Sequence, residues 1–494
     1  MDISNQDQSP VPSEIKAPSI TPVKYNDKEE KYLSKMKQRV FFSYQEREGE
    51  HSEFDGMTYL GRCEDNRKGA NTYVKPKQNK EDTNYASGTI RQKLFTYLAA
   101  LNNLDLSADI NAFDEHNNEI RELGEGVEDI LFKVGEMDGE GGDDEKKVLR
   151  QYNILEQGEV FVLEDYKQGF QKEKDITGDF NGALDSITWT EKLVPEEARC
   201  TRTIIPNENV ILGSCRIFDM ERQPFIAYIE IVSRAEAEAR YSKYQRWQNV
   251  PLEVMEVLSN VTDASKERMY SPFHVFKTTK KEEVEILHYQ DRWNQEAMIT
   301  INGVMILPIG FPLKLISPSG EYNLVKQVGE VISPHFAYGK SQVQRMKNNV
   351  AILDELMRMA LLKTQKSYAP PLINNTGKLL SSRIYAPGKV TYGIDGSKLT
   401  KLDPDANGVT TSEFEMIRMV QESVNANSVD PVASGQQPSG KNVTATQILE
   451  VQRQAKMVMG LTVFVCSLLE EKLAWMRIYD LLKYWFQSDG VDAN

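Results

Sequence analysis

The sequence predicts an α+β protein in which strand-rich stretches lie between long helical ones. Three observations lead to this prediction. Apolar residues recur at helical spacing over 89–104 and 340–365, alternation with a period of two dominates between 159 and 307, and an Asn302-Gly303 turn signal lies within that strand-rich stretch. A chain of 494 residues is also long enough to bury more than one core.

The N-terminal part of the chain is predicted to be an arm followed by helices. Residues 1–30 are rich in Pro, Ser, Gln and charge, so we expect a disordered arm. Residues 89–104 place leucines and a tyrosine at helical spacing, and a second helix is predicted over 117–133. The acidic, glycine-rich segment 135–147 is interpreted as a solvated loop.

Strand signals dominate the middle of the chain. The stretches "GEVFVLEDY" and "DSITWTEKL" alternate apolar and polar residues, and 209–232 is predicted to form two strands joined by a turn. Ser233, answered by Glu236, forms a capping box that begins a charged helix ending near Gln248. Strands resume over 284–307, where the Asn-Gly pair predicts a tight hairpin.

A second long helix, of about 27 residues, is predicted over 340–365. It carries a narrow apolar stripe at steps of three and four: Val343, Met346, Val350, Leu353, Met357 and Ala360. If this helix and the charged helix from Ser233 are antiparallel neighbours, they form a stalk with the strand-rich insert at its tip. The stripe would then be buried by side-by-side copies of the chain; the alternative is a helix lying on its own domain.

Helical signals return near the C-terminus. A Gly-, Pro- and β-rich segment spans 369–402, and a helix capped by Ser412 and Glu415 follows it. The last helical tract is predicted over 443–486, with an interruption near Gly460. No internal repeat is visible in the sequence.

Composition and charge exclude several classes of protein. The net charge of −14 and the pI near 5.1 argue against a conventional tight DNA binder, which needs a basic patch to neutralise phosphates. The four cysteines are far apart and form no CxxC pair, so neither a disulfide framework nor a zinc site is indicated. The apolar stretch 457–469 is shorter than a bilayer span, and the N-terminus does not resemble a secretory signal. We therefore expect a protein made in a reducing cytoplasm.

One stretch, Gly435 to Asn442, is one residue away from the phosphate-binding pattern G-x-x-x-x-G-K-[ST]. A P-loop needs a strand before it and a hydroxyl for magnesium, but the preceding segment has a helical period and Asn442 replaces the hydroxyl. Thr444 and Gln447 instead form a capping box for the next helix. We interpret the stretch as a loop plus a helix cap, with an NTPase site as the alternative.

No other catalytic constellation stands out. The five histidines show no pairing at i,i+3 or i,i+4, and no carboxylate pair is distinguished as acid and base. We therefore predict that the protein is not an enzyme and uses neither a cofactor nor a metal.

Two motifs resemble those of portal proteins, the head–tail connectors of tailed bacteriophages. The stretch "SPHFAYGKSQVQRM" (333–346) is similar to the Tyr-Gly-x-Ser start of the second stem helix in short-tailed-phage portals. The stretch "GKNVTATQILEVQRQ" (440–454) resembles their Val-Thr-Ala-Thr-Glu-Ile segment, with Gln447 where Glu is more usual. The likeness covers roughly 85–486, and a weaker one connects the chain to portals of crAss-like gut phages.

The resemblance implies a ring, usually of twelve subunits, at one vertex of the capsid in the virion. Double-stranded DNA would pass through it during packaging and ejection, without sequence-specific binding. The implied partners are the major capsid protein, the terminase large subunit and then the head–tail adaptor protein, and no membrane is involved. Another head–tail adaptor ring is the alternative, although adaptors are usually far shorter.

The resemblance also implies a division of the chain into parts. These are a wing (31–232 and 366–442), a stem of two helices (233–260 and 334–365), a clip (261–333) and a crown (443–494). Either the region 369–407 or the loop 428–441 would serve as the tunnel loop.

The acidic balance fits a DNA conduit. Duplex DNA carries about one negative charge per 1.7 Å of its axis, so a basic wall would hold it at every step of translocation. Four isolated cations are candidates for transient phosphate contacts, with ordinary surface residues as the alternative: Lys366, Lys378, Arg383 and Lys389.

Overall fold

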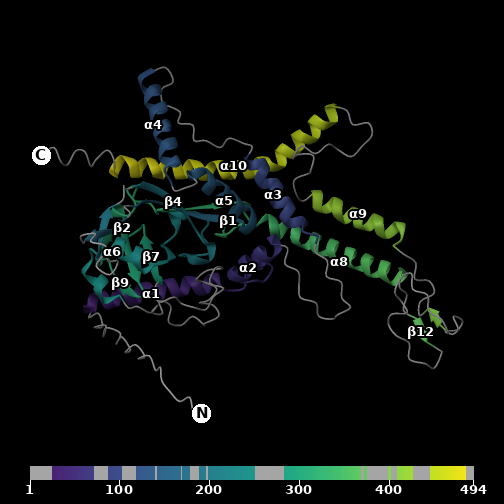
Figure 1. Ribbon diagram of the computed structural model, residues 1–494, viewed down its shortest axis with the longest axis horizontal. Helices are drawn as coiled ribbons and strands as arrows, with labels where there is room; N and C mark the ends of the chain where they lie inside the picture. Colours follow the sequence, from purple (N-terminus) through teal and green to yellow (C-terminus); the bar gives the residue numbers. More distant parts are fainter. Residues whose placement is uncertain are drawn as a thin grey trace, which may run out of the picture.

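The computed structural model describes residues 25–71, 87–102, 118–138, 142–167, 170–177, 188–195, 199–250, 283–368, 372–374, 399–401, 409–426 and 445–484. Within them, helices and antiparallel sheets stack in layers, which confirms the predicted α+β class. Figure 1 shows α1 on one side, two sheets in the middle, and α5 and α10 on the other side.

The helices and strands have the following bounds. The helices are α1 (Asp27–Arg47), α2 (Tyr59–Ala70), α3 (Thr89–Asn102), α4 (Asn118–Glu136), α5 (Gly142–Gln157), α6 (Arg234–Tyr241), α8 (Gln342–Tyr368), α9 (Thr411–Ala426) and α10 (Ala445–Tyr484), with the short 3-10 helices η1 (Ser52–Phe54), η3 (Asn207–Asn209), η4 (Met220–Arg222), η5 (Gln245–Asn249) and η6 (Leu313–Leu315). The strands are β1 (Glu159–Lys167), β2 (Phe170–Thr177), β3 (Thr188–Pro195), β4 (Arg199–Ile205), β5 (Val210–Leu212), β6 (Ile226–Ser233), β7 (Glu283–Asp291), β8 (Glu296–Ile301), β9 (Val304–Met305), β10 (Phe311–Pro312), β11 (Leu324–Val328), β12 (Leu372–Asn374) and β13 (Leu399–Lys401).

The larger sheet has the order β10-β8-β7-β6-β5, with β9 paired to β8. Successive side chains along each strand point to opposite faces of this sheet. Ile229 and Leu287 pack in a core with residues of α1, whereas Val232 and Ile286 pack in a core with residues of α6 and η5. The sheet is therefore covered by helix on both faces.

Two local predictions in this sheet are confirmed. The hairpin between β8 and β9 turns at Asn302 and Gly303, whose φ angles of 45° and 81° are left-handed. Both positive angles are typical of a type I′ turn, which Asn-Gly favours. Of the capping box predicted for α6, the Ser233 half is present, because its side chain accepts a hydrogen bond from the Glu236 N–H, whereas the Glu236 side chain contacts Arg240.

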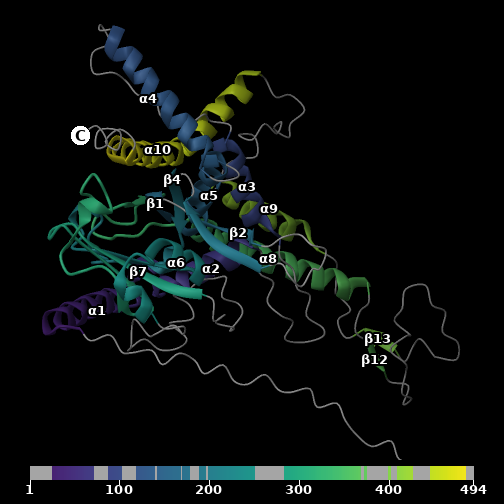
Figure 2. The same ribbon diagram turned by 60° about the vertical axis from the view of Figure 1, so that its left-hand side comes forward.

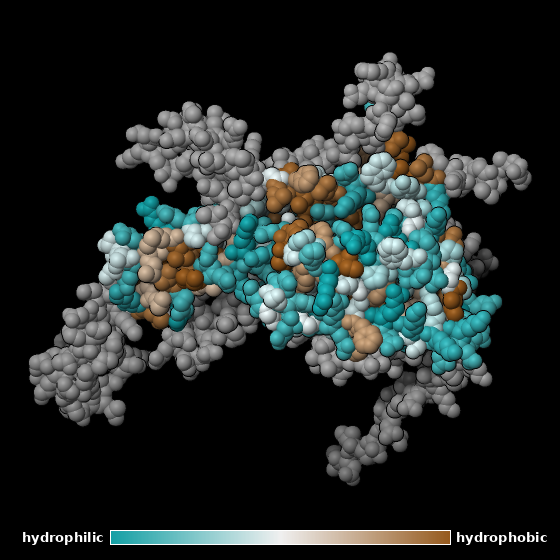
Figure 3. Space-filling view, turned by 180° about the vertical axis from the view of Figure 1, so that it is seen from behind, coloured by the Kyte–Doolittle hydropathy of each residue, from teal (hydrophilic) through white to brown (hydrophobic). Residues whose placement is uncertain are grey.

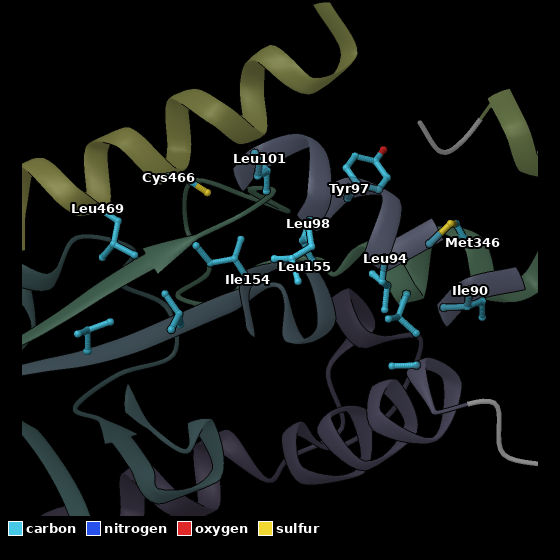
Figure 4. Close-up of a cluster of buried hydrophobic side chains, with 14 of the residues drawn as sticks. Ile90, Leu94, Tyr97, Leu98, Leu101, Ile154, Leu155, Met346, Cys466 and Leu469 are labelled. Carbon is cyan, nitrogen blue, oxygen red and sulfur yellow. The ribbon is translucent and has the colours of Figure 1, made fainter. Parts of the chain in front are cut away.

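The smaller sheet, β11-β1-β4, lies between the larger sheet and a layer of helices. Phe161 and Leu163 of β1 pack in the core shared with β5 and β6. Val160 and Val162 point to the opposite core, which α3, α5, α8 and α10 complete. Figure 4 shows this second core, with α10 on one side of it and α3 beside it.

The strands predicted as a separate clip (261–333) belong to the same body as the predicted wing. Every residue of β6, from Ile226 to Ser233, pairs with a residue of β7, and β11 pairs with β1. The clip prediction is therefore wrong for the described residues 283–333, because backbone hydrogen bonds join them to wing strands.

The predicted first stem helix (233–260) is also corrected. α6 ends at Tyr241 and is followed by η5, while residues 251–282 lie outside the described part of the chain. α6 packs on β2, β6 and β7, whereas α8 packs on α2, α3, α5 and α9. The two helices are thus not antiparallel neighbours, and the described residues do not form the predicted stalk.

The two ends of the chain differ from the predictions as well. α1 begins at Asp27, inside the predicted disordered arm of residues 1–30. α10 is continuous through Gly460, so the predicted interruption there is wrong. Of the predicted crown (443–494), the described residues 445–484 are helical, but the second half of α10 packs on β1 and β11 of the body.

Candidate oligomerisation surface

The Tyr-Gly-x-Ser motif forms the corner from which α8 starts. Tyr338 is buried and its ring lies 4.3 Å from that of Tyr59, centroid to centroid. The Gly339 N–H donates to Glu159 Oε2 at 2.9 Å, and the Gly339 carbonyl accepts from Arg62 Nη1 at 2.6 Å. Arg62 and Glu159 also pair directly and are fully buried. The motif is thus fixed from both sides by one buried ion pair.

Gly339 is required at this corner because its backbone is in close contact with its surroundings. A Cβ there would lie 2.4 Å from Val328 Cγ1 and 2.5 Å from the Gly158 carbonyl oxygen. Ser341 then caps α8, since its Oγ accepts from the Gln344 N–H at 3.0 Å. The Gln344 side chain returns a bond to the Ser341 N–H at 3.1 Å. Together these contacts set the direction in which α8 leaves the body.

The structure covers most of the predicted α8 stripe within one chain. Four of its six residues are buried: Val343 (0%), Met346 (0%), Val350 (5%) and Leu353 (6%). The other two, Met357 and Ala360, are half-buried. The prediction that this stripe is hidden only by neighbouring copies is therefore wrong for those four residues, because α2, α3, α5 and α9 of the same chain surround α8.

Beyond the core, α8 continues together with α9 as a two-helix arm. We define the arm as residues 351–364 and 409–425. The helices are antiparallel, since Lys363 Nζ contacts Glu413 Oε1 at 2.8 Å near one end and Asn349 Nδ2 contacts Ser423 Oγ at 3.3 Å near the other. Figures 1 and 2 show the pair extending away from the sheets.

The arm leaves large apolar side chains at its surface. Six of them are between 37% and 63% exposed: Ile352, Met359, Leu361, Phe414, Met416 and Met419. Apolar side chains gather on this arm and along α10 in the space-filling view (Figure 3). Exposed apolar clusters of this kind commonly mark protein–protein contacts.

The arm has no unpaired cation among its described side chains. Arg358 contacts Glu355 at 2.5 Å, Arg418 contacts Glu422 at 2.9 Å, and Lys363 contacts Glu413 on α9. The arm carries three basic and five acidic residues in total, a net charge of −2. Its surface therefore offers duplex DNA little electrostatic attraction.

The remaining predicted residues fall outside what the structure describes. Lys366 lies in α8, but its side chain is outside the described part, as are Lys378, Arg383 and Lys389. The near-match to a P-loop, 435–442, is likewise outside it. The segment before it is the helix α9, as its period predicts.

The cap predicted for the crown helix also lies outside the described residues. α10 begins at Ala445, directly after Thr444, as the capping prediction requires. Thr444 itself and the side chain of Gln447 lie outside the described residues.

A buried ion network, which the sequence did not reveal, holds α10 on the body. Arg477 of α10 donates to Glu164 Oε1 of β1 at 2.7 Å and to Asp138 Oδ2 at 3.3 Å. Arg150 of α5 donates to both carboxylate oxygens of Glu470 of α10, at 3.0 and 2.8 Å. α10 therefore cannot rotate on the sheet without breaking buried charge pairs.

The same network includes described residues of the segment 135–147, for which the sequence predicts a solvated loop. Asp143 pairs with Arg150 at 2.8 Å and with Arg202 of β4, and Lys146 pairs with Asp138 at 2.6 Å. Burial alone would raise the pKa of Asp143, but Arg202, Arg150 and Arg477 outweigh it and hold that pKa at about 2. The solvated-loop interpretation of 135–147 is thus wrong for these residues.

Asp480 is a further carboxylate beside this network. It is 5% exposed, and burial together with Glu164 and Asp165 raises its pKa to about 8. It is therefore protonated at neutral pH. One feature of the sequence indicates that Arg477 lies on the inner face of α10. Leu469, Leu473 and Arg477 follow each other at intervals of four residues, so they lie on one side of the helix, and all three are buried.

No protein-family model matches the chain, and no curated protein sequence matches it. Within the described residues, no group of three or more His, Cys, Asp or Glu side chains could hold a metal ion. No helix in the described part combines the length and apolar content that crossing a bilayer requires.

Proposed function

We propose that the protein is a portal protein of a tailed bacteriophage. Copies of the chain would assemble into a ring, usually of twelve, at one capsid vertex of the virion, and double-stranded DNA would pass through its channel during packaging and ejection. The major capsid protein, the terminase large subunit and then the head–tail adaptor would dock on it. The two family-like motifs at 333–346 and 440–454 support this proposal.

The observation that carries the proposal is the projecting α8–α9 arm. It leaves the body at a rigid corner, and its apolar surface includes Ile352, Phe414 and Met419. A ring of identical arms would bury this surface in heterologous contacts, in which one side of each copy meets a different side of the next. Because the first half of the α8 stripe is buried within the chain, we place the contact between copies on the exposed part of the arm.

The charge of the arm supports a conduit rather than a DNA-binding protein. With every described cation of the arm paired to a carboxylate, a wall built from it would hold phosphates only weakly. We therefore expect weak DNA binding that is insensitive to sequence and is lost at moderate salt.

Electron microscopy of the purified full chain tests the proposal. Top views should show rings with an axial hole wide enough for a duplex. A population that stays monomeric at micromolar concentration under conditions that favour assembly would contradict it. Closed rings without an axial hole would instead favour another head–tail adaptor or interaction ring.

A further inference from the structure

A small cavity lies between α1 and the tip of the β7–β8 hairpin, and it has a volume of about 200 Å³. The α1 residues in its lining are spaced by three and four positions, so they share one side of the helix. The proposed ring contact uses none of the lining residues. α1 contributes Tyr32, Lys35 and Arg39 to the lining, and the hairpin contributes Tyr289, Asp291 and Glu296.

The Arg39 guanidinium joins the two walls of this cavity. Its Nη1 donates to Asp291 Oδ2 at 3.0 Å and to the Tyr289 hydroxyl at 2.6 Å. Asp291, whose side chain is only 3% exposed, also accepts from the Asn294 N–H at 3.0 Å. Arg39 and Asp291 therefore neutralise each other, and they hold helix and hairpin together without a ligand.

Two opposite charges of the lining remain unpaired. Lys35 is exposed, and no carboxylate in the described part of the chain pairs with it. The half-buried Glu296 accepts a hydrogen bond from the Tyr32 hydroxyl at 2.9 Å, but no cation of the described residues pairs with it. Lys35 and Glu296 thus line the same cavity without pairing with each other.

The two tyrosines of the lining stay protonated. Burial and the hydrogen bond to Glu296 raise the pKa of Tyr32, and burial raises the pKa of Tyr289, in both cases well above the ordinary value of 10. Tyr32 donates to Glu296, whereas Tyr289 accepts from Arg39 and donates to no residue that the structure describes. The Tyr289 hydroxyl can therefore donate one hydrogen bond to a molecule in the cavity.

We infer that this cavity binds a small zwitterion of the amino-acid type, whose carboxylate pairs with Lys35 and whose ammonium group pairs with Glu296. One such molecule satisfies both unpaired charges at once, and its carboxylate can also accept from Tyr289. The volume restricts the ligand to a few carbon atoms, since drug-sized molecules occupy pockets of roughly 300–1,000 Å³. The buried Met36 offers the carbon atoms an apolar contact.

A molecule with a single charge fits this lining less well. An anion such as acetate would pair with Lys35 but would lie near the like charge of Glu296. A cation such as methylammonium would pair with Glu296 but would lie near Lys35 and Arg39. The lining does not indicate a metal ion either, because no described group of three or more His, Cys, Asp or Glu side chains could hold one.

This inference does not depend on the proposed ring. All the lining residues belong to α1 and the hairpin of one chain, and none belongs to the arm. A monomeric chain should therefore bind the zwitterion, and the arm variant Met416→Lys/Met419→Lys should bind it like the original protein. Loss of ring formation in that variant with retained binding would separate the two proposals.

Isothermal titration calorimetry on the full chain tests the inference with three zwitterions of increasing charge separation: glycine, β-alanine and 4-aminobutyrate. At least one of them should bind at one site per chain with a Kd below about 5 mM. Acetate and methylammonium should each bind at least about tenfold more weakly than the tightest zwitterion. The inference is overturned if no zwitterion reaches this affinity, or if either singly charged probe comes within tenfold of the tightest one.

Substitutions in the lining test the two charges separately. Lys35→Gln and Glu296→Gln should each weaken binding of the tightest zwitterion by about tenfold or more, because each removes one ion pair. Glu296→Gln keeps an acceptor for the Tyr32 hydroxyl, so the wall is retained. Lys28→Gln removes an exposed charge of α1 outside the cavity and is the matched control, which should leave the Kd unchanged. An unchanged Kd in either lining variant would overturn the assigned pairing.

Discussion

α8 and α10 each carry apolar rows, but the row of α8 is mostly buried within the chain whereas the outer row of α10 (Leu461, Trp475 and Leu482) is exposed. α8 has an evident apolar stripe in the sequence, and the structure buries most of it inside the chain. α10 is apolar nearly all round, so no single stripe stands out, yet its outer row remains exposed. An apolar row shows that a helix packs against something. Whether the cover is the same chain or another depends on long-range contacts that the row does not encode.

The largest effect is expected from breaking the ion pairs that Arg477 makes on the inner face of α10. Replacing Arg477 by Ala removes one cationic partner from each of the buried carboxylates Glu164 and Asp138, which keep Arg202 and Lys146, so we expect a loss of about 3 kcal/mol in the free energy of unfolding. Urea unfolding measures it. The matched control is Arg418→Ala on the arm, whose ion pair with Glu422 is exposed and whose loss should cost less than about 1 kcal/mol. Equal losses would contradict the view that the inner face fixes α10.

The corner of α8 gives the next largest effect. Gly339→Ala forces a Cβ against Val328 and the Gly158 carbonyl, and we expect a destabilisation of about 2–3 kcal/mol. Gly126→Ala in α4 is the control, because a Cβ there meets no atom within 4 Å and a helical Gly-to-Ala change should be neutral or stabilising. If thermal unfolding shows no difference between the two variants, the corner does not fix α8.

Asp480 gives a pH-dependent effect on the same anchored face. Its pKa is about 8 in the folded chain, above the ordinary value of 3.8, so the folded state retains a proton that the unfolded state releases. Stability should therefore fall as pH rises from about 4 to 8 and level off above that range. Asp480→Asn removes this contribution. The variant should gain on the order of 1 kcal/mol or more relative to the original chain between pH 5 and pH 9. A parallel pH dependence in the two proteins would contradict the assignment.

Exposed apolar residues should matter least to the stability of one chain. Met419→Gln on the arm is expected to change the free energy of unfolding by less than about 0.5 kcal/mol, since its side chain is 63% exposed. The burial of Met346 makes Met346→Gln the contrasting variant, which should cost several times more. Comparable effects would mean that the arm surface is covered within the chain.

Local features of this fold could be predicted from the sequence, and long-range ones could not. The Asn302-Gly303 hairpin and the Ser233 cap depend on residues within a few positions of each other, and both are present. Arg477 and Glu164 are 313 positions apart, so nothing in either neighbourhood indicates their pairing. The α8 stripe was recognised for the same local reason, but the residues that cover it come from α2, α3, α5 and α9.

The same difference between local and long-range features applies to the candidate contact surface on the arm and to the exposed apolar row on α10. The arm was partly foreseen, because the long helix and the helix after it were both predicted and both form. The apolar row on the outer face of α10 was missed, since only the position of the helix on the sheets separates its inner residues from its outer ones. Leu468 and Leu469 are neighbours in sequence, yet they belong to different faces.

The central claim is that the exposed side of the α8–α9 arm joins identical copies into a ring. Mass photometry of the original chain beside the Met416→Lys/Met419→Lys variant tests it most directly. The account predicts one large species near the mass of twelve chains for the original protein, and no such species for the variant. Rings that form equally well with the charged arm, or an original chain that never exceeds a dimer, would contradict it.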